Sequence, residues 1–510
     1  MRKQSLSNVF VEQFRNPVSF KSLAEPVVHG FVWLNGMALL SAVLSFIQTI
    51  IIARVLEPYL VGLVAVFYII QGALDSFTAT GFKKAVIQRK EISQEYVDTA
   101  FVTHLVRGML LAAIVLLSAP FLVRMLGVPE AQYVVQAMAF SILLQGARNP
   151  GALFFLRQLT FYKQFIWHAS GALVRFVTTV VLLYIMENEW AIVYGVLAYE
   201  FAMLFLSYVL IDIHPAFKWD RKAFHELFNY GKWVLLASIA AFIERQGTQI
   251  GTVKLLGEAS LGVLFLGLRI ANMPTLVTQQ LKNTLFPVFS RLQNSLEKTK
   301  RLYQRSLGAL ALFMFPIVGC AFVFAEPFTR LFLKASWAQV AEILGLLIFG
   351  RAFQSLSSVG IALLNAKGMP KFAFFNRLIQ GVIIILGIYP LAKGFGLLGI
   401  AILYTVIGVA SFVFSSTMVF YYLRFELAML RVLLAPVVAT TVTSFIFSYL
   451  VQSVFVIDSI PLFCGTSVVF FVVYFVLIFT WDTVNGKRDR TLSIPLTLKM
   501  VKEAIINIKR

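Results

Sequence analysis

The sequence predicts an all-α polytopic membrane protein with about fourteen transmembrane helices, arranged as two six-helix bundles in parallel repeat plus two C-terminal helices. Hydrophobic residues make up 59% of the 510 residues and charged residues only 13%, whereas soluble domains carry roughly 25% charged residues. Most of the surface of such a chain must therefore face lipid. The lengths of the apolar stretches, the placement of basic residues and an internal repeat support the same fold class.

The apolar stretches have the length that a membrane requires. A helix needs ~20 apolar residues to cross ~30 Å of hydrocarbon. Fourteen stretches of this kind follow one another, with only short polar segments between them. They comprise residues 31–52, 59–80, 97–123, 131–155, 165–186, 190–212, 232–253, 260–281, 304–326, 338–364, 373–392, 396–423, 432–452 and 459–481.

The segments that join these stretches are alternately rich and poor in lysine and arginine. With the N-terminus placed in the cytoplasm, 32 of the 44 basic residues fall in inside segments and six in outside segments. Basic residues gather in cytoplasmic loops because they set the orientation of insertion. The sequence therefore predicts cytoplasmic termini, and this also accounts for the net charge of +20 without nucleic-acid binding.

The two halves of the chain resemble each other at an offset of about 200 residues. Residues 54–56 followed by Gly62 match residues 254–256 followed by Gly262, and residues 120–126 in the third span match residues 327–332 in the ninth. A weaker match joins the fourth span to the tenth. Six spans, an even number, separate the matched segments, so both halves have the same orientation. Parallel repeats are a signature of transporters, whose substrate site lies between the repeats near mid-membrane.

These features divide the chain into six parts. The first is a cytoplasmic N-terminal segment, and the last is a basic amphipathic tail suited to lie on the inner leaflet. In order, the parts are residues 1–26, 27–212 (the first bundle), 213–231 (a cytoplasmic linker), 232–424 (the second bundle), 425–481 (spans 13 and 14) and 482–510 (the tail).

No set of residues indicates catalysis, a metal site or a cofactor. The five histidines are scattered, and Cys320 and Cys464 lie singly in apolar runs. Neither an HExxH motif nor a P-loop is present. We therefore expect no enzymatic activity, no cofactor and no ATP hydrolysis by this chain.

Arginines inside the predicted spans indicate a polar interior, because a charge at mid-membrane is costly unless it faces water or a partner. Few acids accompany them, and guanidinium groups bind phosphate oxygens in a bidentate fork. The six are Arg107, Arg148, Arg175, Arg245, Arg269 and Arg351. The candidates for the substrate cavity are Arg245, Arg269 and Arg351. Arg269 precedes Pro274, which bends a helix and frees backbone carbonyls.

The remaining membrane-embedded charges have other interpretations. Arg107, Arg175 and Glu200 are interpreted as structural ion pairs within the first half or as further cavity charges. Glu244 and Asp75 are candidates for ion coupling, and Glu244 alternatively pairs with an arginine elsewhere in the chain.

Several motifs resemble those of polysaccharide flippases. Residues 53–58, Ala-Arg-Val-Leu-Glu-Pro, resemble the family's signature at the end of the first span, although Glu57 stands where the family usually has glycine. Residues 81–89 resemble the family's segment after the second span, and residues 266–274 and 285–292 resemble its segments around the eighth. The resemblance extends over roughly residues 27–430.

This resemblance implies membership of the multidrug/oligosaccharidyl-lipid/polysaccharide exporter superfamily, with two bundles in a V and alternating access. It implies that an oligosaccharide linked through pyrophosphate to undecaprenol crosses the bacterial inner membrane for O-antigen, capsule or exopolysaccharide assembly. Polysaccharide polymerase and glycosyltransferases are the expected protein partners. Three alternatives are a cation-coupled multidrug exporter, a lipid II flippase and a non-transporting scaffold. The excess of arginine argues against the exporter, and the repeat with its costly internal charges against the scaffold.

Overall fold

A computed structural model of the chain describes residues 20–77, 94–153, 155, 160–211, 215–292, 295–424, 427–453 and 457–485. Throughout these ranges the regular elements are helices, and no strand occurs among them. Nine helices of the described residues are long and apolar enough to cross a membrane. The predicted all-α membrane fold is confirmed, while the count of fourteen crossings stays a prediction. Most of the predicted tail, residues 486–510, lies outside the described residues.

The first group of helices corresponds to the first predicted bundle. A helix pairs the backbone groups between its two ends internally, which is the condition for a chain segment in lipid. The group consists of α2 (Phe20–Val55), α3 (Pro58–Phe77), α5 (Gln94–Leu126), α6 (Gln132–Gly146), α8 (Phe161–Met186) and α9 (Trp190–Val209), with short 3-10 turns at Pro129–Ala131 and Pro150–Leu153. Helix α8 packs against α2 and α9, and α5 packs against α6.

The second group is built around α13, which packs against each of the other four helices of the group. The group consists of α10 (Arg221–Ala271), α11 (Thr275–Arg291), α12 (Leu296–Phe332), α13 (Gln339–Ala366) and α14 (Lys371–Leu423), with a 3-10 turn at Ala335–Trp337. Both α10 and α14 are interrupted by a glycine with positive φ, 83° at Gly257 and 58° at Gly396. Glycine adopts this conformation without steric cost, so each of the two is a pair of helices.

The structure adds three details to the predicted ranges. The predicted span 260–281 is not one helix, because α10 ends at Ala271 and a turn at residues 272–274 precedes α11. Pro274 lacks the N–H that would continue the helical hydrogen bonds through this turn. Helix α10 begins at Arg221, so the predicted linker 213–231 is largely helical, and α2 already begins at Phe20.

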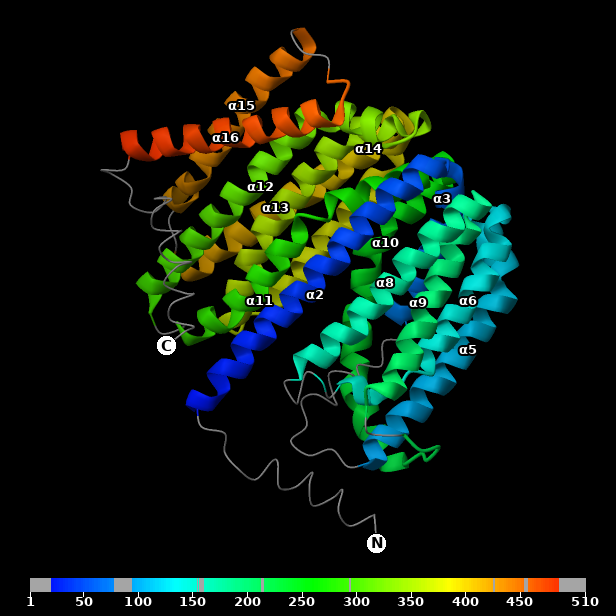
Figure 1. Ribbon diagram of the computed structural model, residues 1–510. Helices are drawn as coiled ribbons and strands as arrows, with labels where there is room; N and C mark the ends of the chain where they lie inside the picture. Colours follow the sequence, from blue (N-terminus) through cyan, green and yellow to red (C-terminus); the bar gives the residue numbers. More distant parts are fainter. Residues whose placement is uncertain are drawn as a thin grey trace.

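The two C-terminal helices lie on the outside of the second group (Figure 1). Helices α15 (Leu434–Ser453) and α16 (Ile460–Asn485) follow a 3-10 helix, Leu427–Leu433, and both pack against α12. Arg330 of α12 donates from Nη2 to the carbonyl oxygen of Ile457 at 2.8 Å, which ties the segment before α16 to the second group.

The two groups meet along α10, which packs against α3, α5 and α2 (Figure 1). Where α2 meets α3, hydrogen bonds join residues 53–57 of the first group to residues 331–337 of the second; we call these contacts the latch. Arg54 donates to the carbonyl oxygens of residues 331 and 332, at 2.6 and 3.0 Å. Trp337 Nε1 donates to the carbonyl oxygen of residue 56 at 2.9 Å. The latch fastens the two groups together at this end.

Candidate substrate cavity

A cavity of about 260 Å³ lies within the second group, between α10, α13 and α14. Three arginines line it, namely Arg245, Arg269 and Arg351. They are accompanied by amide side chains and by two aromatic rings, with a single carboxylate, Glu244. The amides are those of Gln246, Gln249, Asn272, Gln354 and Gln380, and the rings are those of Phe265 and Tyr404.

Helix geometry places the three arginines at a common depth. Arg245 lies twelve residues before the break at Gly257, and Arg269 lies twelve residues after it. Arg351 lies twelve residues after Gln339, the first residue of α13. At 1.5 Å per residue, each arginine is ~18 Å along its helix from the end that carries the latch. This is close to the middle of a hydrocarbon layer of ~30 Å.

Arg351 is held by two neutral groups. Its Nη1 donates to Oε1 of Gln354 at 2.6 Å. Its guanidinium carbon lies 5.3 Å from the centroid of the Tyr404 ring, whose hydroxyl is 2.5 Å from Oγ1 of Thr248. A ring face attracts a cation without neutralising its charge. Arg351 is therefore fixed in place and keeps its positive charge.

Arg269 is held in a similar way at the boundary between the two groups. Its Nη2 donates to Oγ of Ser45 in α2 at 3.3 Å, and its guanidinium lies 5.6 Å from the centroid of the Phe265 ring. Phe265 stacks on Tyr68 of α3 with centroids 5.5 Å apart. Arg175 of α8 donates to the Tyr68 hydroxyl at 3.2 Å. Arg175 therefore adds a positive charge from the first group close to Arg269.

The positive charge of the cavity is largely uncompensated. Within the described part of the chain, no carboxylate forms an ion pair with Arg245, Arg269 or Arg351. The described residues likewise contain no group of three or more His, Cys, Asp or Glu side chains that could hold a metal ion. Guanidinium groups with neutral partners in a medium of low dielectric constant favour an anion, since phosphate oxygens can accept their remaining N–H groups.

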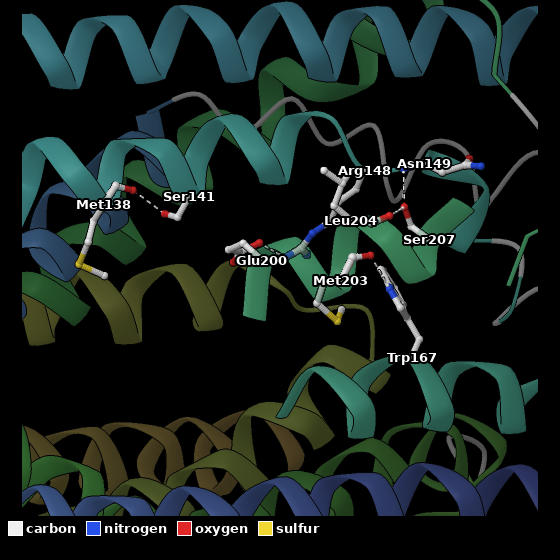
Figure 2. A network of polar contacts seen from close by, with 9 residues as sticks. All are labelled: Met138, Ser141, Arg148, Asn149, Trp167, Glu200, Met203, Leu204 and Ser207. Carbon is white, nitrogen blue, oxygen red and sulfur yellow. Dashed lines mark hydrogen bonds and ion pairs between the residues drawn. The ribbon is translucent and has the colours of Figure 1, made fainter. Parts of the chain in front are cut away.

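Arg148 lies in a different environment, where a carboxylate neutralises it. It forms an ion pair with Glu200 of α9, which is 6% exposed (Figure 2). Next to this pair, Trp167 Nε1 donates to the carbonyl oxygen of Met203 at 2.9 Å. The structure therefore brings Glu200 together with Arg148, and this pair is internal to the first group.

The other predicted site residues are dispersed. Arg107 lies beside His104 in a separate cavity of about 30 Å³ between α5 and α6. Glu244, although it lines the main cavity, forms an ion pair with Nε of Arg377 in α14 at 3.6 Å. Asp75 lies in α3, and its side chain is outside those that the structure describes.

The uncharged members of the cavity were not predicted from the sequence. Gln354, Gln380 and Tyr404 are common residue types that carry no formal charge, so a search for costly charges does not find them. One signal was available, because Gln354 follows Arg351 by three residues and therefore lies on the same face of the helix.

Comparison with known proteins gives a family and several relatives. A family model described as "Polysaccharide biosynthesis protein" matches residues 51–342, which is more than half of the chain. The succinoglycan biosynthesis transport protein ExoT of Rhizobium meliloti (strain 1021) is 24% identical, with 66% of this chain and 69% of that protein covered. The lipopolysaccharide biosynthesis protein WzxC of Escherichia coli (strain K12) is 22% identical, with 70% of this chain and 73% of that protein covered. The teichuronic acid biosynthesis protein TuaB of Bacillus subtilis (strain 168) is 21% identical, with 68% of this chain and 73% of that protein covered.

Solved structures share the fold. The lipid II flippase MurJ in an inward closed conformation superposes with a TM-score of 0.68 at 14% identity, covering 88% of this chain and 99% of that one. An inward-facing multidrug resistance transporter of the MATE family, from the MOP superfamily, superposes with a TM-score of 0.60, covering 75% and 95%. The chain therefore shares its overall helical fold with these two solved proteins.

Proposed function

Since this chain belongs to the polysaccharide biosynthesis protein family, we propose that it is a flippase for an oligosaccharide linked through pyrophosphate to undecaprenol. The cargo would cross the bacterial inner membrane for the assembly of O-antigen, capsule or exopolysaccharide. Relatives named for succinoglycan transport, lipopolysaccharide biosynthesis and teichuronic acid biosynthesis support a role in polysaccharide export.

The observation that carries the proposal is the set of three guanidinium groups at one depth in one cavity. Arg245, Arg269 and Arg351 line this cavity without a carboxylate partner within the described residues. A pyrophosphate diester is the part of the proposed cargo that carries negative charge, and it must be shielded from the hydrocarbon. The three arginines supply this shielding while the lipid tail stays in the bilayer.

Transport would follow alternating access, with rocking of one group of helices against the other. With both termini in the cytoplasm, the latch closes the periplasmic end, and the cargo enters from the cytoplasmic side. Opening of the latch then releases the glycan on the opposite side. No covalent step is needed. The polymerase and the glycosyltransferases of the same pathway are the expected partners.

The proposal assigns ion coupling to Glu244, with Asp75 as a second candidate. Glu244 lies at the cavity wall and pairs with Arg377 at 3.6 Å. A proton or metal cation that neutralised this carboxylate would release Arg377 toward an anionic cargo. An ion gradient would thereby change the affinity of the cavity for phosphate.

Alanine substitution of the three arginines tests the proposal. In a strain that depends on this gene, the triple variant is expected to abolish surface polysaccharide and to accumulate lipid-linked oligosaccharide in the inner leaflet. Arg124→Ala, at an exposed position in α5, is the matched control. Normal surface polysaccharide in the triple variant, at unchanged protein level, would contradict a role for this cavity.

The alternatives differ in their cargo. A multidrug exporter that takes up cations would be hindered by a cavity with three uncompensated arginines. A lipid II flippase would carry the same pyrophosphate, and the likeness to MurJ concerns the fold alone. Rescue of growth in cells depleted of their lipid II flippase would favour that alternative. Rescue of polysaccharide export without rescue of growth would favour the proposed function.

A further inference from the structure

Arg351 is the first member of a chain of hydrogen bonds that leads from the cavity wall into the interior between α13 and α14. Its Nη1 donates to Oε1 of Gln354 at 2.6 Å, and Nε2 of Gln354 donates to Oε1 of Gln380 at 3.3 Å. Nε2 of Gln380 then lies 3.5 Å from Oγ of Ser411 in α14. The chain thus connects the wall of the cavity on α13 with two positions on α14.

The direction of this chain is fixed at both ends. A guanidinium group can only donate, so Gln354 must turn its carbonyl oxygen to Arg351 and its NH₂ group to Gln380. At the other end, Oγ of Ser411 accepts from Nδ2 of Asn376 at 3.0 Å and donates to Oγ of Ser357 at 2.8 Å. A hydroxyl group has one donor and two acceptor positions. Ser411 therefore has only acceptor capacity left for Gln380, which must present its NH₂ group.

The part of the chain beyond Gln354 is also buried. Gln380 is 2% exposed, and Ser411 and Ser357 are each 1% exposed. Buried polar side chains cost free energy unless they are hydrogen-bonded, and apolar residues of similar size would fill the same space. A buried polar network in which Gln354, Gln380, Ser411 and Ser357 are joined by hydrogen bonds therefore indicates a role beyond filling the interior.

We propose that Gln354 and Gln380 are positioning residues that hold Arg351 in the cavity with its charge uncompensated, ready to bind a phosphate group. This inference rests on the proposed function. The amide of Gln354 accepts one hydrogen bond from the guanidinium group but carries no charge. The remaining N–H groups and the full positive charge of Arg351 are thereby available to the pyrophosphate.

Arg148 provides the contrast within the same chain. Its partner Glu200 is a carboxylate, and the resulting pair has little net attraction for an anion. Glutamate and glutamine have almost the same shape, so the residue type at position 354 decides whether Arg351 is neutralised. An acid at this position would still accept from Arg351 and would lower its affinity for phosphate, although it could not donate to Oε1 of Gln380.

The substitution Gln354→Glu tests this assignment in the purified full-length protein in lipid nanodiscs. Isothermal titration calorimetry with inorganic pyrophosphate measures the affinity of the cavity. Gln249→Glu is the matched control, because Gln249 lines the same cavity and, among the described residues, its side chain hydrogen-bonds only to the backbone carbonyl of Arg245. We expect Gln354→Glu to weaken pyrophosphate binding about tenfold or more, clearly beyond the effect of Gln249→Glu. The melting temperature should change little, because the new ion pair with Arg351 offsets the lost hydrogen bond to Oε1 of Gln380.

The second variant, Gln380→Met, removes the acceptor that orients the Gln354 amide. We expect a smaller loss of affinity, roughly threefold, that disappears when Arg351 is also replaced by alanine.

Equal affinities of Gln354→Glu and Gln249→Glu would overturn the proposal, as would a parallel fall of affinity and melting temperature. If the unmodified protein fails to bind pyrophosphate, the arginine site itself is wrong. If it binds and Gln354→Glu binds equally well, only the positioning role is wrong.

Discussion

Gly62 of α3 and Gly262 of α10 cross with their backbones in contact. A Cβ atom at Gly262 would lie 3.0 Å from the Gly62 nitrogen and would overlap the carbonyl oxygen of Pro58. The two glycines are equivalent positions in the predicted internal repeat, 200 residues apart. Equivalent positions of a two-fold arrangement can touch only near the axis that relates them, so the predicted repeat would have its pseudo-two-fold axis at this crossing.

Gly262→Ala is expected to push α3 and α10 apart at the crossing. Overpacking of a close contact costs about 1–3 kcal/mol, and here the neighbouring atoms belong to rigid backbone. The melting temperature of the purified protein should fall, and surface polysaccharide should decrease. Gly465→Ala in α16 is the control, because an added methyl group there meets nothing within 4 Å. Equal melting temperatures of the two variants would show that the crossing tolerates a side chain.

Arg54→Ala is expected to weaken the latch. The side chain donates to the carbonyl oxygens of residues 331 and 332 at the end of α12, at 2.6 and 3.0 Å. These carbonyl groups carry the partial negative charge of a helix C-terminus and have no partner within the helix. Because Arg54 is exposed, we expect a loss of about 1 kcal/mol, which is roughly a fivefold shift toward the open latch.

The shift can be followed by labelling a cysteine at Val61, which is 3% exposed in the closed arrangement. A membrane-impermeant thiol reagent should react faster with Val61→Cys in the Arg54→Ala background, after replacement of Cys320 and Cys464 by serine. Arg124→Ala serves as the control at the same predicted face. If labelling rates did not differ between the two backgrounds, Arg54 would have no part in closure.

Closure of the latch is expected to depend on pH through Glu57. Its Oε1 lies 2.5 Å from Nζ of Lys334, and hydrogen bonds from Lys334 and Ser336 hold the pKa of Glu57 below its ordinary value of 4.5. A lowered pKa means that the closed latch favours the ionised carboxylate. The contribution of Glu57 is therefore fully present above its ordinary pKa and is lost as the pH falls through the lowered one.

In Glu57→Gln this dependence should be absent. Labelling of Val61→Cys cannot be used at low pH, because thiols react as thiolates. We therefore expect the fluorescence of Trp337, in a variant without other tryptophans, to report opening on acidification. An identical pH profile in Glu57→Gln would assign the dependence to another group. The matched variant Glu130→Gln, at the same predicted face, should keep the profile of the unmodified protein.

The sequence predicted those features that depend on composition and on the cost of charge in lipid. Apolar length and the placement of basic residues predicted the helical membrane fold, whereas the repeat inferred from the match around Gly62 and Gly262 stays a prediction. Arg245, Arg269 and Arg351 were selected as charges that hydrocarbon does not tolerate, and all three line one cavity. Their role in binding cargo stays a proposal.

Features that depend on contacts between distant segments were not predictable. The sequence did not identify the arginine that pairs with Glu200, because helical spacing does not tell which arginine of another helix faces it. The break at residues 272–274 was expected as a bend at Pro274 but not as a division of the predicted span 260–281 into two helices. The latch joins residues 53–57 to residues 331–337, and no local pattern links segments so far apart.

The ion pair of Arg148 and Glu200 tests the distinction between an arginine that is paired with a carboxylate and the arginines that line the cavity. Removal of one partner leaves an uncompensated buried charge, so Glu200→Leu should destabilise the protein by about 3 kcal/mol or more. The double variant Arg148→Met/Glu200→Leu should recover most of this stability, since apolar residues replace both charges. Thermal unfolding measures both effects. Pyrophosphate binding in the double variant should equal that of the unmodified protein, because this pair is internal to the first group. A double variant that regained stability but lost pyrophosphate binding would make Arg148 part of the anion site, and the distinction between paired and uncompensated arginines would fail.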